Sequence, residues 1–287
     1  MQNINSVNPL DYTRHHRSCY ERPNLKRNPW NIRMSDSVTE PYTSETIQLL
    51  QNRVSTRKYT DEPVPDEMVE AVLEAAYRAP TSSNIQSYTT IVVRNPETKQ
   101  KLSVVTGNQK HVADTPVFLA FCVDLTRIEY ALMKHQHNFR ENNMEVGLVS
   151  SVDAALVGMS AYLVAESLGL RGLMIGAVRN DAVATAEILG LPNRVYCLFG
   201  MCLGWPAEQP PQKPRMDLGA TVHYEKYDAE ATLASLNNYD SALAEHYEEI
   251  GKATTPDSWT HDMDKKFHPP LRDSLREQLK KQGFDFR

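Results

Sequence analysis

The chain has 287 residues, of which 41% are hydrophobic and 23% charged, the composition of an ordinary globular protein. Its formal net charge of −5 argues against generic nucleic-acid binding, which needs a basic surface. The longest apolar runs, residues 117–123 and 195–203, have the length of strands, so we expect no membrane-spanning segment.

Four cysteines, Cys19, Cys122, Cys197 and Cys202, are too few and too scattered for a disulfide scaffold. Cys197 and Cys202 also lack the two-residue gap of a zinc knuckle or a redox pair. We expect them to be small apolar residues of a reduced core, which favours the cytoplasm.

The first 33 residues differ from the rest, with six basic residues against two acidic ones. They contain no apolar core of a secretion signal and show little periodicity. Met34 then opens a segment, Met-Ser-Asp-Ser, that looks like an ordinary protein start. An extension without function and a functional basic arm both stay open. We expect residues 1–40 to be mobile and functionally silent, and residues 41–287 to form the folded domain.

Hydrophobic periodicity and turn residues predict a mixture of helices and strands along the chain. In chain order we expect a helix over 43–52, a helix over 65–79, a strand over 89–93, a helix over 96–105, a strand over 117–123, a helix over 149–168, a strand over 173–178, a helix over 181–189, a strand over 194–203 and helices over 230–249 and 260–282. Strands and helices do not alternate strictly as βαβ units. This order predicts an α+β fold with a sheet flanked by helices.

Two of the predicted helices are informative in detail. The helix over 65–79 has Pro65 in its first turn, a position that proline favours, and apolar residues at helical spacing. The helix over 149–168 is apolar on most faces, so it belongs in a domain interior or at a large subunit interface. Gly169 and Gly190 close the helices that precede them. The last two helices form a polar C-terminal excursion over about residues 229–287.

Three short segments carry groups that bind anions or polar rings. Arg53, Ser55 and Arg57 alternate, so in an extended segment they point the same way and form a phosphate cradle. Residues 79–86 are small and polar, which lets backbone amides approach a flat ligand, and residues 213–215 set Lys213 and Arg215 across a rigid proline. Taken singly, each segment is also typical of a solvated edge or surface loop.

Several familiar sites are absent from the sequence. There is no Gly-x-Gly-x-x-Gly or Gly-Lys-Thr/Ser loop, which argues against a Rossmann site or a P-loop. No Gly-x-Ser-x-Gly elbow marks a serine hydrolase. His111, His135 and His137 have no acidic partner at zinc-site spacing, so we expect solvated histidines and no metal.

Together, the motifs of the chain resemble the nitroreductase family, specifically the group of larger bacterial oxygen-insensitive NADPH nitroreductases and flavin reductases. The resemblance runs from about Ile47 to the C-terminus. Its motifs are Arg53/Ser55/Arg57 with residues 59–63, then residues 79–86, 106–112, 165–170, 175–180, 199–206 and 213–215. Singly each motif is weak, but this order and spacing is specific.

The resemblance implies an α+β fold with a mostly antiparallel sheet and an intertwined homodimer whose interface builds two FMN sites. Arg53, Ser55, Lys213 and Arg215 would hold the FMN phosphate. Arg57 and the Gly176 amide would be the catalytic positions, near the pyrimidine edge and N5 of the flavin. Further contacts to the ring would come from Thr81, Ser82, Ser83, Gln109, Ile175 and Ala177, with one subunit supplying the first three.

The activity implied by the resemblance is hydride transfer from NADPH or NADH, through bound FMN, to nitroaromatics, quinones or free flavin by a ping-pong mechanism. The partners would be the second subunit and small acceptors, with no nucleic acid and no membrane. An alternative is a flavin reductase or redox-sensing flavoprotein that serves a partner, with nitro reduction incidental. A fold that survives without its cofactor is a weaker alternative.

Two departures from the family pattern qualify these implications. Val54 stands where the family commonly has a second Arg or a similar polar residue, which leaves the cradle one donor short. Members that select NADPH place arginines between their last two helices, whereas residues 250–257 here contain only Lys252 as a basic residue. A single ammonium substitutes poorly for guanidinium forks on a 2′-phosphate. We therefore expect weak discrimination between NADPH and NADH, or help from Arg179.

Overall fold

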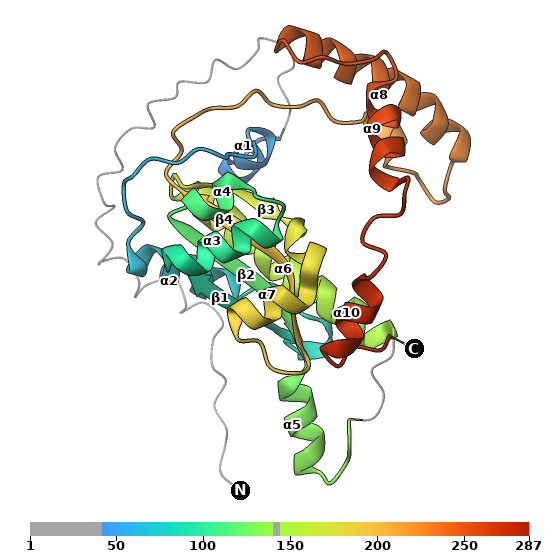
Figure 1. Ribbon diagram of the computed structural model, residues 1–287. Coiled ribbons are helices and arrows are strands. Elements are labelled where there is room, and N and C mark those ends of the chain that lie inside the picture. The colour runs from blue at the N-terminus through green and yellow to red at the C-terminus, as the bar shows by residue number, and fades with distance from the viewer. Residues whose placement is uncertain (1–41, 140–143, 287) are drawn as a thin grey trace, which may run out of the picture. The chain divides into compact units, whose positions relative to one another are not determined.

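The computed structural model describes residues 42–139 and 144–286. Within this part a four-stranded sheet forms the centre, with strand order β1-β2-β4-β3 and antiparallel pairing throughout. The strands are β1 (Tyr88–Val93), β2 (Val117–Asp124), β3 (Arg171–Ile175) and β4 (Val195–Gly204). Figure 1 shows the sheet surrounded by helices, so the expected α+β fold with a mostly antiparallel sheet is confirmed. The prediction that residues 1–40 are mobile lies outside the described residues.

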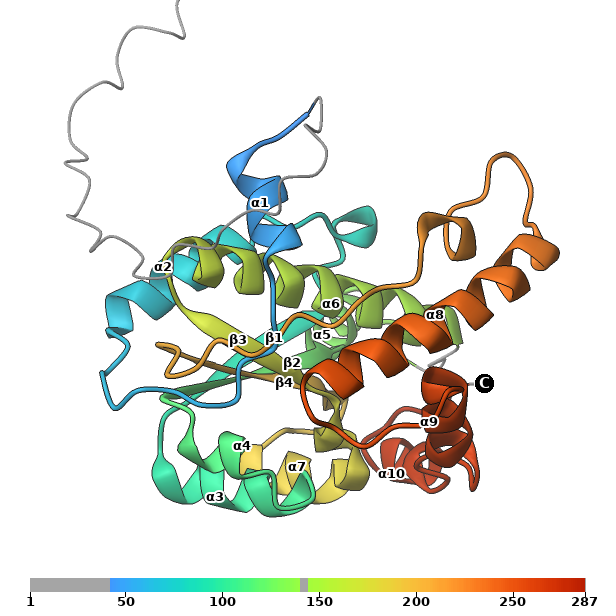
Figure 2. The same cartoon turned by 90° about the horizontal axis from the view of Figure 1, so that it is seen from above.

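Helices cover both faces of the sheet. Side chains alternate along β2, so that Leu119 and Phe121 pack against α2 (Asp66–Ala76) and α6 (Met144–Ser167). Phe118 and Ala120 point to the opposite face. That face is covered by α3 (Pro96–Val105), α4 (Lys110–Asp114) and α7 (Ala182–Leu189), and Figure 2 shows the resulting three layers. All eight residues of β2 are buried because both faces of the central strand are covered.

Helix α6 is the long core helix, and ten of its residues are buried, among them Val157 and Ala161. By length and composition alone it is the one helix of the described residues that could cross a membrane, a property that core helices of globular proteins share. Its apolar character has another explanation in the fold, because it packs on the sheet and on α2. Gly158 permits this approach, since a Cβ there would lie 2.4 Å from Cζ of Phe199 on β4.

Most predicted elements are present with boundaries shifted by a few residues, including α1 (Glu45–Gln51) and α8 (Ala229–Glu249). The C-caps Gly169 and Gly190 both have positive φ, as expected for glycines that close helices. Cys122, Cys197 and Cys202 are buried and free, which confirms the expectation for these three; Cys19 lies outside the described residues.

Four secondary-structure predictions were wrong. The strand expected over 173–178 is β3, which ends at Ile175, and Gly176–Asp181 form a 3-10 turn instead. The helix expected over 260–282 is two helices, α9 (Ser258–Phe267) and α10 (Leu275–Lys281), because Pro269 and Pro270 cannot continue a helix. The short helices α4 and α5 (Thr126–Lys134) were not expected, and His135 is the C-cap of α5.

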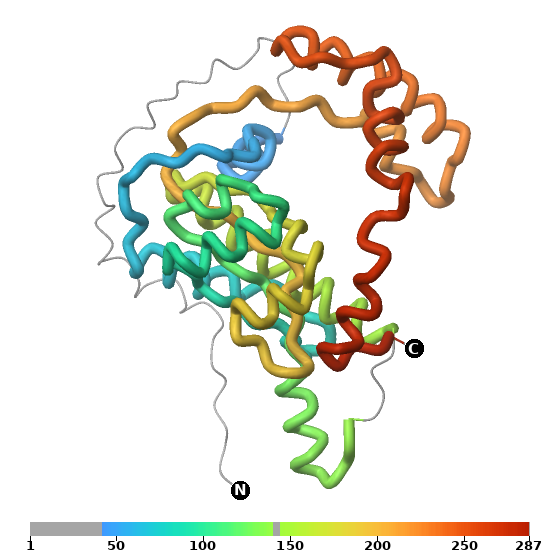
Figure 3. The backbone as a smooth tube through the Cα atoms, viewed as in Figure 1, coloured from blue at the N-terminus to red at the C-terminus, as the bar shows by residue number. Residues whose placement is uncertain are grey.

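The C-terminal part leaves the sheet after β4 and returns to it, as the tube in Figure 3 shows. Asp240 of α8 fixes α9, because its Oδ1 accepts the backbone amides of Trp259 (2.6 Å) and Thr260 (2.9 Å) at the start of that helix. The chain then returns to pack on the end of the sheet, where Leu279 and Phe284 are buried against Tyr196.

Candidate flavin site

The alternating Arg53, Ser55 and Arg57 lie in an extended segment along the edge of the sheet. The Thr56 amide donates to the Gly172 carbonyl of β3 (3.2 Å), and Tyr59 bridges to Pro206 after β4. These contacts place the segment at the end of the sheet where β2 begins. Residues 210–215 leave β4 at the same end, so the two candidate anion-binding segments meet although about 160 residues separate them.

Two adjoining cavities mark the place where the segments meet, with volumes of about 330 Å³ and about 270 Å³. Both are lined by Arg53, Gln212, Lys213 and Arg215, and the second also by Ser55 and Arg57. We call these five candidate residues, Arg53, Ser55, Arg57, Lys213 and Arg215, the cation cradle. Gln212 ties its two halves together, because its side-chain amide donates to the backbone carbonyls of Gln51 and Arg53.

The charges of the cradle are not neutralised by carboxylates. Over the residues that the structure describes, none of the ion pairs within 4.0 Å involves Arg53, Arg57, Lys213 or Arg215. Four cationic side chains around connected cavities repel one another unless an anion lies among them. The arrangement therefore fits a phosphate, which guanidinium and ammonium groups bind with charge-assisted hydrogen bonds.

A buried carboxylate lies behind the cradle, and its ion pair is with a residue outside the cradle. Glu166 of α6 is 4% exposed and forms an ion pair with Arg171 at 2.7 Å. Burial raises the pKa of Glu166, while Tyr162 and the charges of Arg171 and Arg53 partly offset that rise. The Tyr162 hydroxyl donates to the Val54 carbonyl (3.1 Å), which fixes the backbone of the cradle segment. Glu166 lies within the family motif of residues 165–170, and the sequence alone predicted no role for it.

The cradle extends toward Gln109 through Arg57. The Gln109 Oε1 and the His111 Nε2 are 3.2 Å apart, and His111 lies on α4 at the same end of the sheet. Burial lowers the pKa of His111, and the nearby charge of Arg57 lowers it further. Arg57 itself is exposed, with its backbone amide held by the Glu208 carboxylate at 3.2 Å. The contact of Arg57 and Gln109 with one ligand stays a prediction.

Ile175, Gly176 and Ala177 lie where β3 passes into the 3-10 turn. Arg179 folds back within this turn, since a Cβ on Gly176 would be 3.4 Å from the Arg179 Nη2. The guanidinium donates to the Leu198 carbonyl of β4. In this conformation one Arg179 donor is used within the chain, and the predicted contact to a nicotinamide dinucleotide stays a prediction.

Lys252 lies beside the cradle rather than apart from it. The ammonium of Lys213 donates to the Tyr247 hydroxyl (2.7 Å), and the Lys252 Nζ is 3.5 Å from the centroid of the same ring. Burial raises the pKa of Tyr247, but the two lysines outweigh this effect and hold it below its usual value. Tyr247 is buried at the end of α8, and no sequence pattern singled it out.

The loop with Thr81, Ser82 and Ser83 lies at the opposite end of the sheet. It leads into β1, where the Asp124 amide donates to the Ser87 carbonyl at the end of β2. The cradle adjoins the beginning of β2, because Val117 pairs with Leu203 and Leu203 with Gly172. Eight residues of strand span roughly 24 Å at about 3.4 Å per residue. One chain therefore does not bring the loop and the cradle together.

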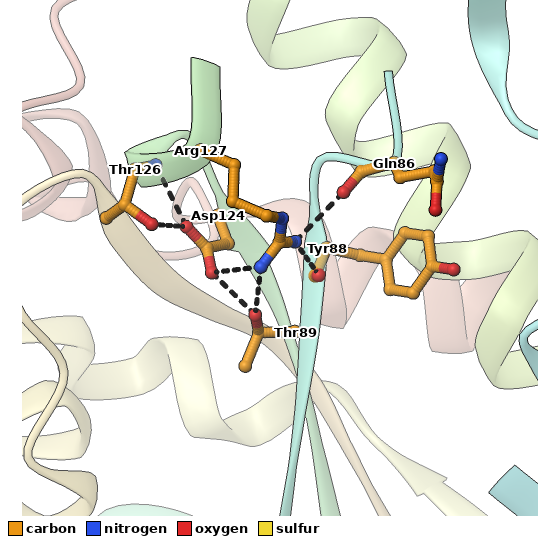
Figure 4. Close-up of polar contacts among 6 residues, drawn as sticks. All are labelled: Gln86, Tyr88, Thr89, Asp124, Thr126 and Arg127. Atoms are coloured by element: carbon orange, nitrogen blue, oxygen red, sulfur yellow. Dashed lines mark hydrogen bonds and ion pairs between the residues drawn. The ribbon is translucent and has the colours of Figure 1, made fainter. Parts of the chain in front are cut away.

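Side chains from two helices hold this loop, and Figure 4 shows the contacts of Arg127 and Asp124 on one side of it. Arg127 of α5 donates to the carbonyls of Gln86 (2.9 Å) and Tyr88, and pairs with Asp124 at 3.1 Å. On the other side, the Ser82 amide donates to Asp153 of α6 at 2.9 Å. Sequence reasoning did not identify Arg127, Asp124 or Asp153.

Two family models match the chain. The nitroreductase family model covers residues 50–205, and the model of the nitroreductase family C-terminal domain covers residues 213–287. The chain is 38% identical to the oxygen-insensitive NADPH nitroreductase of Salmonella typhimurium, over 84% of this chain and 98% of that protein. It is 36% identical to an NAD(P)H FMN reductase of Bacillus subtilis, again over 84% of this chain and 98% of that protein.

Solved structures agree with the sequence comparison. The fold matches B. megaterium NfrA2 with a TM-score of 0.82 at 32% identity, covering 85% of this chain and all of that one. It matches the NfrA1 nitroreductase of B. subtilis with a TM-score of 0.80, also at 32% identity, covering 84% of this chain and 99% of that one. By sequence, by fold and by the motifs that form its cation cradle, the chain belongs to the nitroreductase family.

Proposed function

We propose that the chain is an FMN-dependent oxidoreductase that passes hydride from NADPH or NADH to nitroaromatics, quinones or free flavin. The observation that carries the proposal is the cation cradle, in which charged groups from two distant segments surround connected cavities without a neutralising carboxylate. Relatives over most of the chain are named nitroreductase, FMN reductase and NADPH-flavin oxidoreductase, which supports the same chemistry.

The donor set of the cradle fits the phosphate of FMN. Arg53 and Arg215 offer guanidinium forks, Ser55 a hydroxyl and Lys213 an ammonium, so several donors can share one dianion. When bound, FMN supplies a ring that takes up hydride and passes the electrons on. Arg57 would place a positive charge beside the ring and stabilise its reduced form. Gly176 would let the ring approach the backbone of the turn after β3.

The proposal requires a homodimer, because one chain holds the cradle and the loop of Thr81, Ser82 and Ser83, which we call the serine loop, at opposite ends of its sheet. An exposed apolar stripe on α6 supports this requirement. Met144, Leu148 and Val152 are each more than half exposed, and they recur every four residues along one face of the helix. Exposed apolar rows of this kind mark interaction sites. We infer that the stripe packs against a second copy, which adds its loop of Thr81–Ser83 to the cradle of the first.

The choice of nicotinamide cofactor depends on Lys252 and Arg179 in this proposal. Both already have partners within the chain, Tyr247 and the Leu198 carbonyl. A 2′-phosphate would therefore gain little, and we expect NADPH and NADH to be used with similar efficiency. The kcat/KM ratio for the two donors measures this, before and after Lys252→Ala and Arg179→Ala. A preference for NADPH of about 100-fold, or about 2.7 kcal/mol, that survives both substitutions would contradict the expectation.

The direct test of the proposed function is to purify the full chain and measure its flavin content, mass in solution and turnover. We expect a yellow dimer with one FMN per subunit that oxidises NADPH and NADH with nitroaromatic, quinone or flavin acceptors. Double-reciprocal plots should be parallel, as for a ping-pong enzyme. We also expect it to act in the cytoplasm, where the buried thiols stay reduced. A colourless monomer that ignores added FMN would overturn the proposal.

A further inference from the structure

The loop before β1 has a backbone conformation that its residues do not favour. Ser83, Asn84 and Gln86 have φ values of 46°, 58° and 54°, within four consecutive positions. Side chains clash with the backbone in this left-handed region, and Ser and Gln tolerate it less well than Gly or Asn. Such a conformation persists only where its surroundings enforce it. The structure must therefore hold this loop from outside.

Arg127 is the group that holds the second half of the loop. One nitrogen, Nη2, donates to the Gln86 carbonyl at 2.9 Å and to the Tyr88 carbonyl. The other, Nη1, donates to Thr89 Oγ1 at 3.2 Å and to Asp124 Oδ2 at 3.1 Å. Figure 4 shows the guanidinium between the loop and the end of β2, with contacts to both. A planar fork with several donors suits this task, whereas an ammonium cannot reach all four acceptors in one geometry.

Asp124 sets the position of Arg127. Its side chain is 8% exposed, and its Oδ1 accepts the Thr126 amide (2.9 Å) and hydroxyl (2.6 Å) at the start of α5. Burial raises the pKa of Asp124, but the hydrogen bonds from Thr126 and Thr89 and the charge of Arg127 outweigh it, so the carboxylate is ionised at neutral pH. An ion pair between two exposed side chains would contribute little to the stability of the loop. This pair is different because the carboxylate is buried and the arginine holds backbone carbonyls.

Asp153 holds the first half of the loop from the opposite side. It is 1% exposed on α6, and its Oδ1 accepts the Ser82 amide. The strained residues Ser83–Gln86 thus lie between two fixed points, one on α6 and one on α5. The Arg127 contact lies at Gln86, the last residue of the loop with positive φ.

We propose that Arg127, set in place by Asp124, is a positioning residue that holds residues 82–86 in the conformation that receives the flavin ring at the partner's cradle. The inference rests on the proposed function, because it needs the loop to line a flavin. It assigns a role to α5, a helix outside every motif by which the family was identified. Arg127 touches no part of the cradle of its own chain, so its effect reaches the flavin only through the loop.

The test uses the full-length dimer with Arg127→Ala and Arg127→Lys, and Lys134→Ala as the matched control on the same helix. FMN is titrated into the flavin-free protein, and amide hydrogen exchange of the peptide over residues 79–88 is followed without FMN. We expect Arg127→Ala to speed exchange in this peptide and raise the Kd for FMN about tenfold, with a changed circular dichroism band of the bound flavin. Arg127→Lys should lie between Ala and wild type, and Lys134→Ala should match wild type.

The outcomes separate the two proposals. Faster exchange in Arg127→Ala with an unchanged Kd and flavin spectrum would overturn the inference, because the loop would then be held for stability alone. Unchanged exchange would overturn it too. A wild-type protein that binds no FMN would instead overturn the proposed function, while the exchange data would still report whether Arg127 holds the loop. If Arg127→Ala does not fold, the intermediate behaviour of Arg127→Lys decides.

Discussion

At the scale of single residues, Arg57 is a cradle side chain with few other contacts. Its guanidinium donates only weakly to the Ser55 carbonyl at 3.5 Å, and its side chain is exposed. Replacing it with Ala should leave the fold intact but remove the positive charge that stabilises the reduced flavin. We expect the Kd for FMN to rise, or the rate of flavin reduction to fall, about tenfold, or about 1.4 kcal/mol.

Stopped-flow absorbance of the flavin during mixing with NADPH measures the reduction rate. The neighbouring Lys58→Ala is the control, since Lys58 is exposed and points to Glu208 instead. Equal FMN content and an equal reduction rate in Arg57→Ala and wild type would remove Arg57 from the site.

His111 makes a prediction about pH. Burial and the charge of Arg57 lower its pKa in the folded protein below the unfolded value of 6.5. The unfolded chain therefore binds more protons than the folded one as pH falls below about 6.5, so stability falls in the same direction. His111→Asn should make the flavin-free protein lose less stability than wild type between pH 7 and pH 5. Urea unfolding at several pH values measures the difference, and parallel curves for the two proteins would refute it.

The cradle shows how far residue-level prediction could go. Arg53, Ser55 and Arg57 were recognisable because alternate positions of an extended segment face one way, and the structure places Lys213 and Arg215 beside them. Tyr247 and Arg127 were not found, because each acts through contacts with residues distant in sequence. Glu166 was given no role, although its ion-pair partner Arg171 is only five residues away. A buried Glu in an apolar helix was the one available signal, since such a charge needs a partner.

At the scale of elements, α6 and β4 meet at a glycine. A Cβ on Gly158 would overlap the ring of Phe199, which stacks on Phe121 at 5.2 Å. Gly158→Ala should therefore destabilise the protein by about 1–3 kcal/mol through overpacking, although alanine is the better helix former. Urea unfolding measures this change. The double variant Gly158→Ala/Phe199→Leu should recover part of it, and a single variant as stable as wild type would show that the contact relaxes freely.

The helices that the sequence predicted well include α2, whose apolar residues recur at helical spacing, and α6, which is a long run apolar on most faces. The five residues of α4 offer too few turns to show a period. Helix α5 was missed although its nine residues are nearly as many as those of α3. The split between α9 and α10 was missed although Pro269 and Pro270 marked it, because polar residues continue on both sides. The end of β3 was placed too late, since Val178 is apolar and buried in the turn just as it would be in a strand.

At the scale of the whole molecule, two features of one chain point to the second. The cradle and the serine loop lie at opposite ends of β2. Helix α6 exposes the apolar stripe of Met144, Leu148 and Val152. A buried charge in the stripe would oppose packing of two copies, since an unpaired charge is costly to bury. Val152→Glu should therefore give a monomer that also loses FMN, because each site needs both chains. Light scattering and flavin absorbance of the purified protein measure the two effects together.

The control is Val104→Glu, which places the same charge at an equally exposed valine on α3, away from the stripe. It should stay dimeric and yellow. If the partner supplies the loop, a variant that loses the dimer must also lose FMN. Charge substitutions at Leu148 and Val152 should therefore change light scattering and flavin absorbance together. A folded monomer of Val152→Glu that keeps one tightly bound FMN would show that a single chain completes the site, and would refute the shared arrangement.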